Sequence, residues 1–169
     1  MTCAGAGKKP KPEFPPLLPA GLHVLDALAL FRLTVGNFKT SAKRPVLWAS
    51  LMKFCEELRD EGIIPCNLWL DGSFLTEKVE PDDIDLIVEL DNSIYSKLRM
   101  ASLAYFQRLS SQPLHVETRC LHTFLMIKYP ILHIDHAFSL AVRKQWEYDF
   151  GHALLSKTPK GIVILEVGP

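Results

Sequence analysis

The sequence predicts one α/β or α+β domain, in which helices pack on a β-sheet. Its 169 residues fit a single domain, and 48% hydrophobic residues are enough to bury an ordinary core. Along the chain, segments with apolar residues at helical spacing are interspersed with short apolar or β-branched runs. This order of helices and strands is typical of a sheet covered by helices.

The first sixteen residues are predicted to be a Pro-rich extension, and residues 17–169 to be the domain. Five of the twelve prolines fall within residues 1–20, a composition that favours extended chain over helix. We expect a mobile tip that becomes ordered near Leu17.

Two helices are predicted next. Residues 21–35 carry apolar residues near helical spacing, and Gly36 with Asn37 supplies a stop signal. Residues 44–62 give the clearest helical pattern, with Pro45 in the first turn and Gly62 as the C-terminal cap. The apolar stripe of this second helix consists of Leu47, Leu51, Phe54, Cys55 and Leu58.

The remaining elements are read in the same way. Residues 67–72 and 83–90 are predicted strands joined by a loop. Asp91, Asn92 and Ser93 offer N-cap chemistry for a helix that ends before Pro113. After it we expect strands over 114–119, 123–129 and 131–138, a helix from 139 to 151, and a last strand over 161–167.

Charge and cysteine content exclude some classes of protein. Nineteen basic and nineteen acidic side chains give a formal charge of zero, without the basic footprint of a dedicated nucleic-acid binder. The four cysteines form no C-x-x-C pair, and the start lacks the apolar region of a secretory signal, so we expect reduced thiols in a cytoplasmic protein. The most apolar early run is interrupted by Asp26 and is shorter than the ~20 residues of a membrane span.

The stretch from Leu68 to Leu90, LWLDGSFLTEKVEPDDIDLIVEL, carries the chemistry. Side chains alternate along a strand, so Asp83 and Asp85 share one face, with their Cα atoms ~6.6 Å apart. Two carboxylates at this spacing can ligate Mg²⁺ (or Mn²⁺) together with substrate phosphate. Gly72 ends a strand where the backbone needs positive φ or close approach to a ligand, and Ser73 with nearby N–H groups can hold a polyphosphate.

A simpler interpretation stands beside this one. Isolated Asp-x-Asp pairs are common, and such residues are often solvated loop residues or helix caps, just as Gly72 and Ser73 can form an ordinary turn. The order of strand, Gly-Ser, loop and Asp-x-Asp strand is more specific than either pair alone.

This order resembles the signature of the DNA polymerase β-like nucleotidyltransferase superfamily. LLPAGLH before the first helix, LDGSFLTEKVEPDDIDLIV and PKGIVIL also resemble a bacterial nucleotidyltransferase-like domain family of unknown function. The resemblance implies a nucleotidyltransferase-like mixed β-sheet flanked by helices. It also implies a nucleotide-holding turn at Gly72 and Ser73, and metal ligands at Asp83 and Asp85.

The superfamily pattern includes a third acidic residue on a later strand. Asp135 in ILHIDHAF is the first choice, with Glu117 and then Asp149 as alternatives; an acid paired with a neighbouring histidine explains Asp135 nearly as well. Many superfamily members also carry Arg-Gly just after Gly-Ser. Here Thr76 and Lys78 are the candidates for that phosphate contact.

Other kinds of site fit less well. The spacing of the histidines matches no familiar zinc pair, and Ser73 lacks the G-x-S-x-G frame of a serine hydrolase. No P-loop or G-x-G-x-x-G is present. Lys160 can bring an ammonium to a phosphate, although a turn lysine before a strand is the commoner explanation, and Trp69 and Trp146 are more often core than base-stacking residues.

The sequence therefore predicts a metal-dependent nucleotidyltransferase that transfers NMP from an NTP to an acceptor, which can be a protein, RNA or a small molecule. The alternative is a catalytically silent protein of the same fold that senses nucleotide, or that serves as an operon-encoded partner in a toxin–antitoxin or phage-defence system. No membrane partner is expected.

Overall fold

The structure, a computed structural model, describes residues 12–109 and 120–169 and has an α/β architecture built on a five-stranded mixed sheet. The strands are β1 (Gly21–Val24), β2 (Cys66–Asp71), β3 (Ile84–Asp91), β4 (Leu121–Lys128) and β5 (Gly161–Val167). Their order in the sheet is β1-β5-β2-β3-β4. β1 is parallel to β5 and β3 is parallel to β4, whereas β2 is antiparallel to both of its neighbours.

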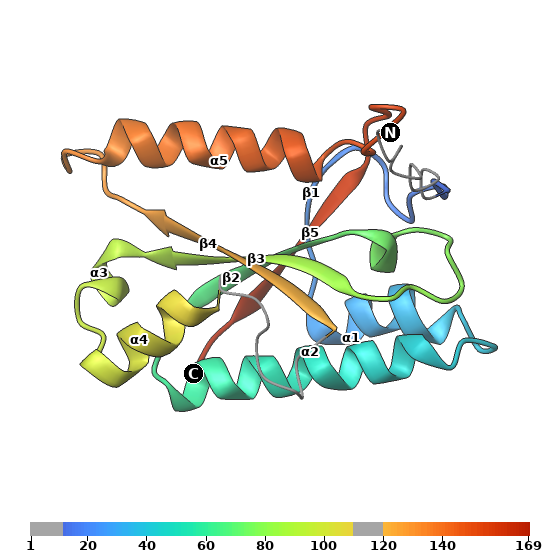
Figure 1. The fold of residues 1–169 in the computed structure, drawn as a ribbon, viewed down its shortest axis with the longest axis horizontal. Helices are drawn as coiled ribbons and strands as arrows, with labels where there is room; N and C mark the ends of the chain where they lie inside the picture. Colours follow the sequence, from blue (N-terminus) through green and yellow to red (C-terminus); the bar gives the residue numbers. More distant parts are fainter. Residues whose placement is uncertain (1–11, 110–119) are drawn as a thin grey trace, which may run out of the picture.

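Helices cover both faces of this sheet (Figure 1). α1 (Ala27–Phe31), α2 (Lys43–Asp60) and α4 (Met100–Arg108) lie on one side, and α5 (His136–Phe150) lies on the other. The shorter pieces are a π-helical turn over Arg32–Gly36, a 3₁₀ turn over Ser73–Leu75 and α3 (Asn92–Tyr95). The fold class predicted from the sequence is confirmed.

Each face of the sheet has its own apolar core. The larger core joins the sheet to α2 and contains the whole predicted stripe of that helix, from Leu47 to Leu58. The smaller core lies under α5, where Trp69 and Ile87 of the sheet pack with Phe150 and partly buried Trp146. Trp69 is fully buried and therefore a core residue. Burial of apolar side chains on both faces explains why β3 reads as an almost continuous apolar run.

Most predicted elements are confirmed, and three differ. Residues 21–24 form β1, not helix, because they pair with β5; the helix starts at Ala27, where Asp26 accepts a hydrogen bond from the Ala29 N–H at 2.7 Å. The helix after Asp91 is interrupted, because residues 96–99 separate α3 from α4. The strand predicted over 131–138 is wrong, since these residues form a turn and the start of α5.

The remaining predictions have the following outcomes. The strand predicted over 114–119 lies outside the described residues. Cys55, Cys66 and Cys120 are free, as expected. Within the described chain, no helix has the length and apolar character required to cross a membrane. The mobile tip predicted at the N-terminus lies largely outside the described residues. Within them, the Glu13 carboxylate accepts a hydrogen bond from the Leu155 N–H at 2.6 Å.

Candidate functional site

The predicted pair of acids lies where β3 begins. Asp83 immediately precedes the strand and Asp85 is its second residue. Asp85 lies two residues before Ile87 and therefore points to the face that α5 covers. The side chains of Asp83 and Asp85 are 24% and 33% exposed, so both are accessible from solvent.

Two independent observations show that position 72, next to this pair, requires glycine. Its φ is +82°, a conformation that L side chains rarely adopt. A Cβ at this position would overlap Asp85 Oδ2 and lie 3.2 Å from Asp85 Cγ. The turn therefore requires glycine, as the sequence predicted, but the close approach that requires it is to Asp85 of the same chain.

His122 joins the two acids from the neighbouring strand. It is the register partner of Asp85 in the parallel β3–β4 pair. Its Nδ1 lies 3.3 Å from Asp85 Oδ1 and 3.5 Å from Asp83 Oδ2. The structure thus brings together Asp83, Asp85 and a histidine on the later strand, where the sequence predicted a third acid.

A buried ion pair lies next to this group. Asp71 is the register partner of Asp85 on the other side, in the antiparallel β2–β3 pair. Lys160, just before β5, places its Nζ 2.7 Å from Asp71 Oδ1. Asp71 is 6% exposed, and Lys160 provides the opposite charge that a buried carboxylate requires.

Burial and neighbouring charge shift the pKa values of these carboxyls. Desolvation raises the pKa of Asp71 to about 6, although the ammonium of Lys160 acts in the opposite direction. Desolvation also raises the pKa of Asp85, and the negative charge of Asp83 raises it further, whereas His122 lowers it. Clustered carboxylates that repel one another are a common feature of sites that bind cations.

Asp135 does not lie with the other two acids. It precedes α5, beyond Lys128 at the far end of β4, and Lys128 is about 20 Å along the strand from His122. Its Oδ2 lies 3.6 Å from His133 Nδ1, which matches the simpler interpretation of this residue. The placement predicted for Asp135 is therefore corrected, because the chain turns after β4 and α5 runs back along the sheet.

The other two candidates for the third acid have different outcomes. Glu117 lies outside the described residues. Asp149 is exposed in the last turn of α5, and its carboxylate accepts a hydrogen bond from Gln145 at 3.0 Å.

Thr76 and Lys78 hold the loop together. Thr76 Oγ1 donates to the Ser73 carbonyl at 2.8 Å, and Lys78 Nζ donates to Asp82 Oδ2 at 2.9 Å. Their carbonyl oxygens accept from Arg44 Nη2 at 2.7 and 2.6 Å. Both residues therefore already have intramolecular partners at the positions expected to contact phosphate.

Sequence reasoning missed His122, Asp71 and the role of Arg44. The position of Asp71 could have been predicted, because the end of one strand of a hairpin lies opposite the start of the next strand. The position of His122 could have been predicted in part, since a parallel strand after β3 begins near the same edge of the sheet. Nothing in the local pattern around Arg44 indicates its burial.

The candidates for binding a metal ion at this site are the carboxylates of Asp83 and Asp85. Across residues 12–109 and 120–169, no group of three His, Cys, Asp or Glu side chains is arranged to hold a metal ion. Asp83 and Asp85 still fit a hard divalent cation, because Mg²⁺ is usually held by one or two carboxylates and completed by water and substrate phosphate.

Comparison with known proteins gives a family but no activity. Residues 12–166 match a family model described as a family of unknown function (DUF6932). No curated protein matches. No solved structure matches either.

Proposed function

The chain belongs to this family of unknown function, and we propose from its site that it is a metal-dependent nucleotidyltransferase, which transfers NMP from an NTP to an acceptor. One observation carries the proposal: Asp83 and Asp85 both contact the His122 ring, and Asp85 lies against the turn at Gly72 so closely that a Cβ there would overlap its carboxylate. We assign nucleotidyl transfer to this arrangement because the sequence resembles the polymerase β-like superfamily.

In this proposal each residue has a limited task. Asp83 and Asp85 would hold Mg²⁺ or Mn²⁺, and the ion, when bound, would offset the charge of the phosphate oxygens. Gly72 keeps the turn close to Asp85, and Ser73 presents its backbone and hydroxyl to the triphosphate. Lys160 offsets the charge of Asp71, so a third carboxylate beside the pair does not repel the nucleotide.

Calorimetric titration with each NTP, with and without Mg²⁺, tests the proposal. We expect metal-dependent binding by the wild type and loss of most of that binding in an Asp83→Asn/Asp85→Asn double variant. Asp135→Asn is the matched control, because it removes one carboxylate at the opposite end of the sheet and should bind as the wild type does. Equal binding by the double variant, or no binding by the folded wild type, would contradict the proposal.

A second candidate rests on His122. The superfamily pattern has an acid on a later strand, whereas the residue of the later strand β4 that contacts both carboxylates in the described part of the chain is a histidine. This favours a catalytically silent protein that binds nucleotide as a sensor or as a partner in a toxin–antitoxin or phage-defence system. Incubation with α-labelled NTP separates the two candidates, since transfer releases pyrophosphate and silent binding does not.

The acceptor and the compartment are also part of the proposal. The proposed acceptor is a protein, an RNA or a small molecule, and the near-neutral charge does not favour long nucleic acid as the sole acceptor. Free thiols at Cys55, Cys66 and Cys120 support a reducing, cytoplasmic environment.

A further inference from the structure

A row of ionisable side chains crosses the sheet at the acid pair. Its members are, in the order in which their strands pair, Lys160 just before β5, Asp71 of β2, Asp85 of β3 and His122 of β4. Asp85 is the register partner of both Asp71 and His122. The residues two positions along the strands from Lys160, Asp71 and Asp85 belong to the core under α5, so these side chains share the face that α5 covers.

Asp71 and Asp85 are two like charges directly opposite each other in this row. The Cβ atoms of such a pair in an antiparallel sheet lie about 4.5–5.5 Å apart, and like charges at these positions are destabilising. Two carboxylates at this spacing can also ligate a divalent cation together. A positive charge is therefore required beside Asp71, and it decides whether Asp71 can be a metal ligand.

Lys160 supplies this charge and occupies both carboxylate oxygens of Asp71. Its Nζ lies 2.7 Å from Oδ1 and donates to Oδ2 at 2.8 Å. The side chains of Lys160 and Asp71 are only 14% and 8% exposed. Separating a buried ion pair leaves an uncompensated charge, and Mg²⁺ gives up its bound water reluctantly. The ammonium therefore keeps Asp71 from ligating an ion that binds next to it.

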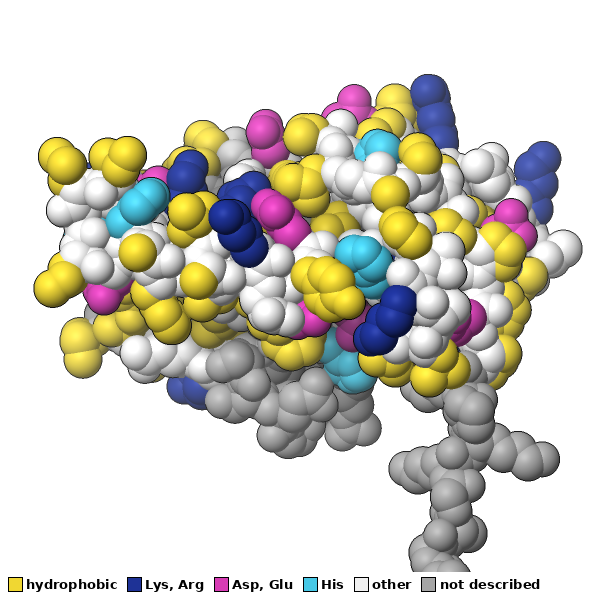
Figure 2. Space-filling model, turned by 90° about the horizontal axis from the view of Figure 1, so that it is seen from above, with side chains coloured by type: hydrophobic (Ala, Val, Ile, Leu, Met, Phe, Trp, Pro, Cys, Tyr) yellow, Lys and Arg dark blue, Asp and Glu magenta, His cyan; other side chains and the backbone are white. Residues whose placement is uncertain are grey.

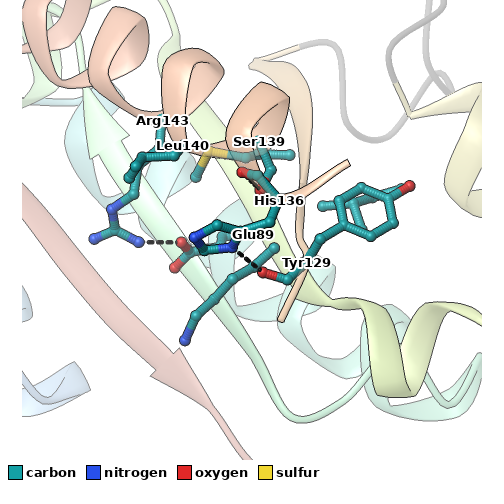
Figure 3. A pocket seen from close by; sticks show the side chains of 9 residues that line it. Glu89, Tyr129, His136, Ser139, Leu140 and Arg143 are labelled. Carbon is teal, nitrogen blue, oxygen red and sulfur yellow. Dashed lines mark hydrogen bonds and ion pairs between the residues drawn. The ribbon is translucent and has the colours of Figure 1, made fainter. Parts of the chain in front are cut away.

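A buried carboxylate farther along the same face is paired in the same way. Glu89 lies four residues beyond Asp85 on β3 and is buried. Arg143 of α5 binds it at the wall of a cavity of about 360 Å³ between α5 and the sheet (Figure 3). Asp83 and Asp85 differ, because they are partly exposed and share the ring of His122. The acid pair is thus open to a metal ion, whereas the buried acids have their own cations.

We propose that the site takes a single divalent cation, at Asp83 and Asp85, and that Lys160 stands in for a second cation by keeping Asp71 out of the ligand set. The inference rests on the proposed function and deepens it, since it gives the number of ions. A two-metal site places one ion at the attacking oxygen and one at the leaving oxygen. Here one of two positive charges is a fixed ammonium, and Lys160 acts as a positioning residue through Asp71.

Binding of Mn²⁺, followed by electron paramagnetic resonance, tests the inference. We expect one bound Mn²⁺ per wild-type chain and two per chain in Lys160→Met, in which Asp71 is free to ligate. Two-ion sites hold their ions about 3.5–4 Å apart, so the second ion should also give a spin-coupled signal. The measurement is made at pH 8, because burial raises the pKa of Asp71 and the ionised form is the ligand.

Two control variants separate the release of Asp71 from the loss of a charge. The double variant Asp71→Asn/Lys160→Met removes both charges and should bind one Mn²⁺, as the wild type does. Lys144→Met removes a lysine that is exposed on α5 and should also leave the number at one. A second ion in either control would show that the number of ions does not depend on Asp71, and this would overturn the inference.

Thermal unfolding keeps the test decisive if Lys160→Met is unstable, since this variant leaves Asp71 buried without its cation. Mn²⁺ should raise the melting temperature of Lys160→Met more than that of the wild type or the double variant, because the ion replaces the ammonium. The inference is wrong if the wild type binds two ions, if Lys160→Met binds one, or if Lys160→Met gains no extra stability from Mn²⁺. A wild type that binds no Mn²⁺ would contradict the proposed function itself, and the inference with it.

Discussion

Arg44 is fully buried, and within residues 12–109 and 120–169 its guanidinium hydrogen bonds go to carbonyl groups rather than to a carboxylate. Its guanidinium donates to the carbonyls of Thr34 and Phe74 at 2.7 and 2.9 Å, in addition to those of Thr76 and Lys78. Desolvation lowers its pKa to about 10, so it stays charged at neutral pH. The planar guanidinium group donates to four carbonyl groups at once and holds the loop between Gly72 and Asp83 against the start of α2.

Replacing Arg44 with lysine should therefore lower the free energy of unfolding by roughly 2–4 kcal/mol, because one ammonium cannot satisfy four buried carbonyls. Urea unfolding followed by circular dichroism measures this change. Arg59→Lys is the matched control, since Arg59 is exposed and donates through Nε to the Gly168 carbonyl; it should change the value by less than about 0.5 kcal/mol. Similar losses in the two variants would show that Arg44 does not hold the loop as described.

The same loop supplies the cap of α2. Ala42 at the N-cap has no side chain that can accept a hydrogen bond. Glu80, which is distant in the sequence, caps the helix instead. Its carboxylate accepts hydrogen bonds from the N–H groups of Ala42 and Lys43, each at 2.9 Å, and from Ser41 Oγ at 3.1 Å. The helix and the loop next to the acid pair are therefore stabilised together.

Glu80→Gln should lower stability at neutral pH but not in acid. The N–H groups of Ala42 and Lys43 hold the pKa of Glu80 below its ordinary value of 4.5. A lowered pKa stabilises the folded state above pH 4.5, and this contribution is lost as the pH falls through the folded-state pKa. Urea midpoints of the wild type and the variant should thus differ at pH 7 and converge near pH 3.

Glu56→Gln controls for the loss of a carboxylate, since Glu56 is exposed on α2, away from its first turn. It should change the urea midpoint far less than Glu80→Gln does at pH 7. A difference between wild type and Glu80→Gln that stays constant from pH 7 to pH 3 would argue against carboxylate capping.

How far each element could be predicted depends on where its partners lie in the sequence. Residues 44–62 carry a complete local signal, with apolar periodicity and end signals, and α2 follows it closely. Residues 21–24 form a strand only because β5 lies beside them, and β5 is more than a hundred residues away. Apolar periodicity within a short window cannot detect such a partner.

At the scale of the whole molecule, the residues of the candidate site could also be predicted only where their partners lie close in the sequence. The order of Gly-Ser and Asp-x-Asp predicts that Gly72 and Asp85 act together, and the antiparallel pairing of β2 with β3 brings them into contact. His122 joins them only because β4 crosses over and begins beside β3. Asp135 was predicted to join them, but it lies at the opposite end of the sheet, and no local pattern gives the direction in which α5 returns.

The turn before α5 shows why an apolar run is not always a strand. Ile131, Leu132 and Ile134 are 78%, 97% and 93% exposed. Figure 2 shows hydrophobic side chains protruding at the left end of the molecule, the end at which α5 begins in Figure 1. Their alternation with polar residues resembles a strand, yet these side chains are not packed in the core.

Leu132→Ser/Ile134→Ser should therefore leave the free energy of unfolding within about 0.5 kcal/mol of the wild type, because no buried apolar area is lost. Leu70→Ala, at a fully buried position of β2, should lower it by about 2–5 kcal/mol, since it leaves a cavity in the core. Urea unfolding of the two variants beside the wild type measures both effects. A loss in the double variant as large as that in Leu70→Ala would mean that the turn packs against the protein in solution, and the exposed surface at this end would then have to be revised.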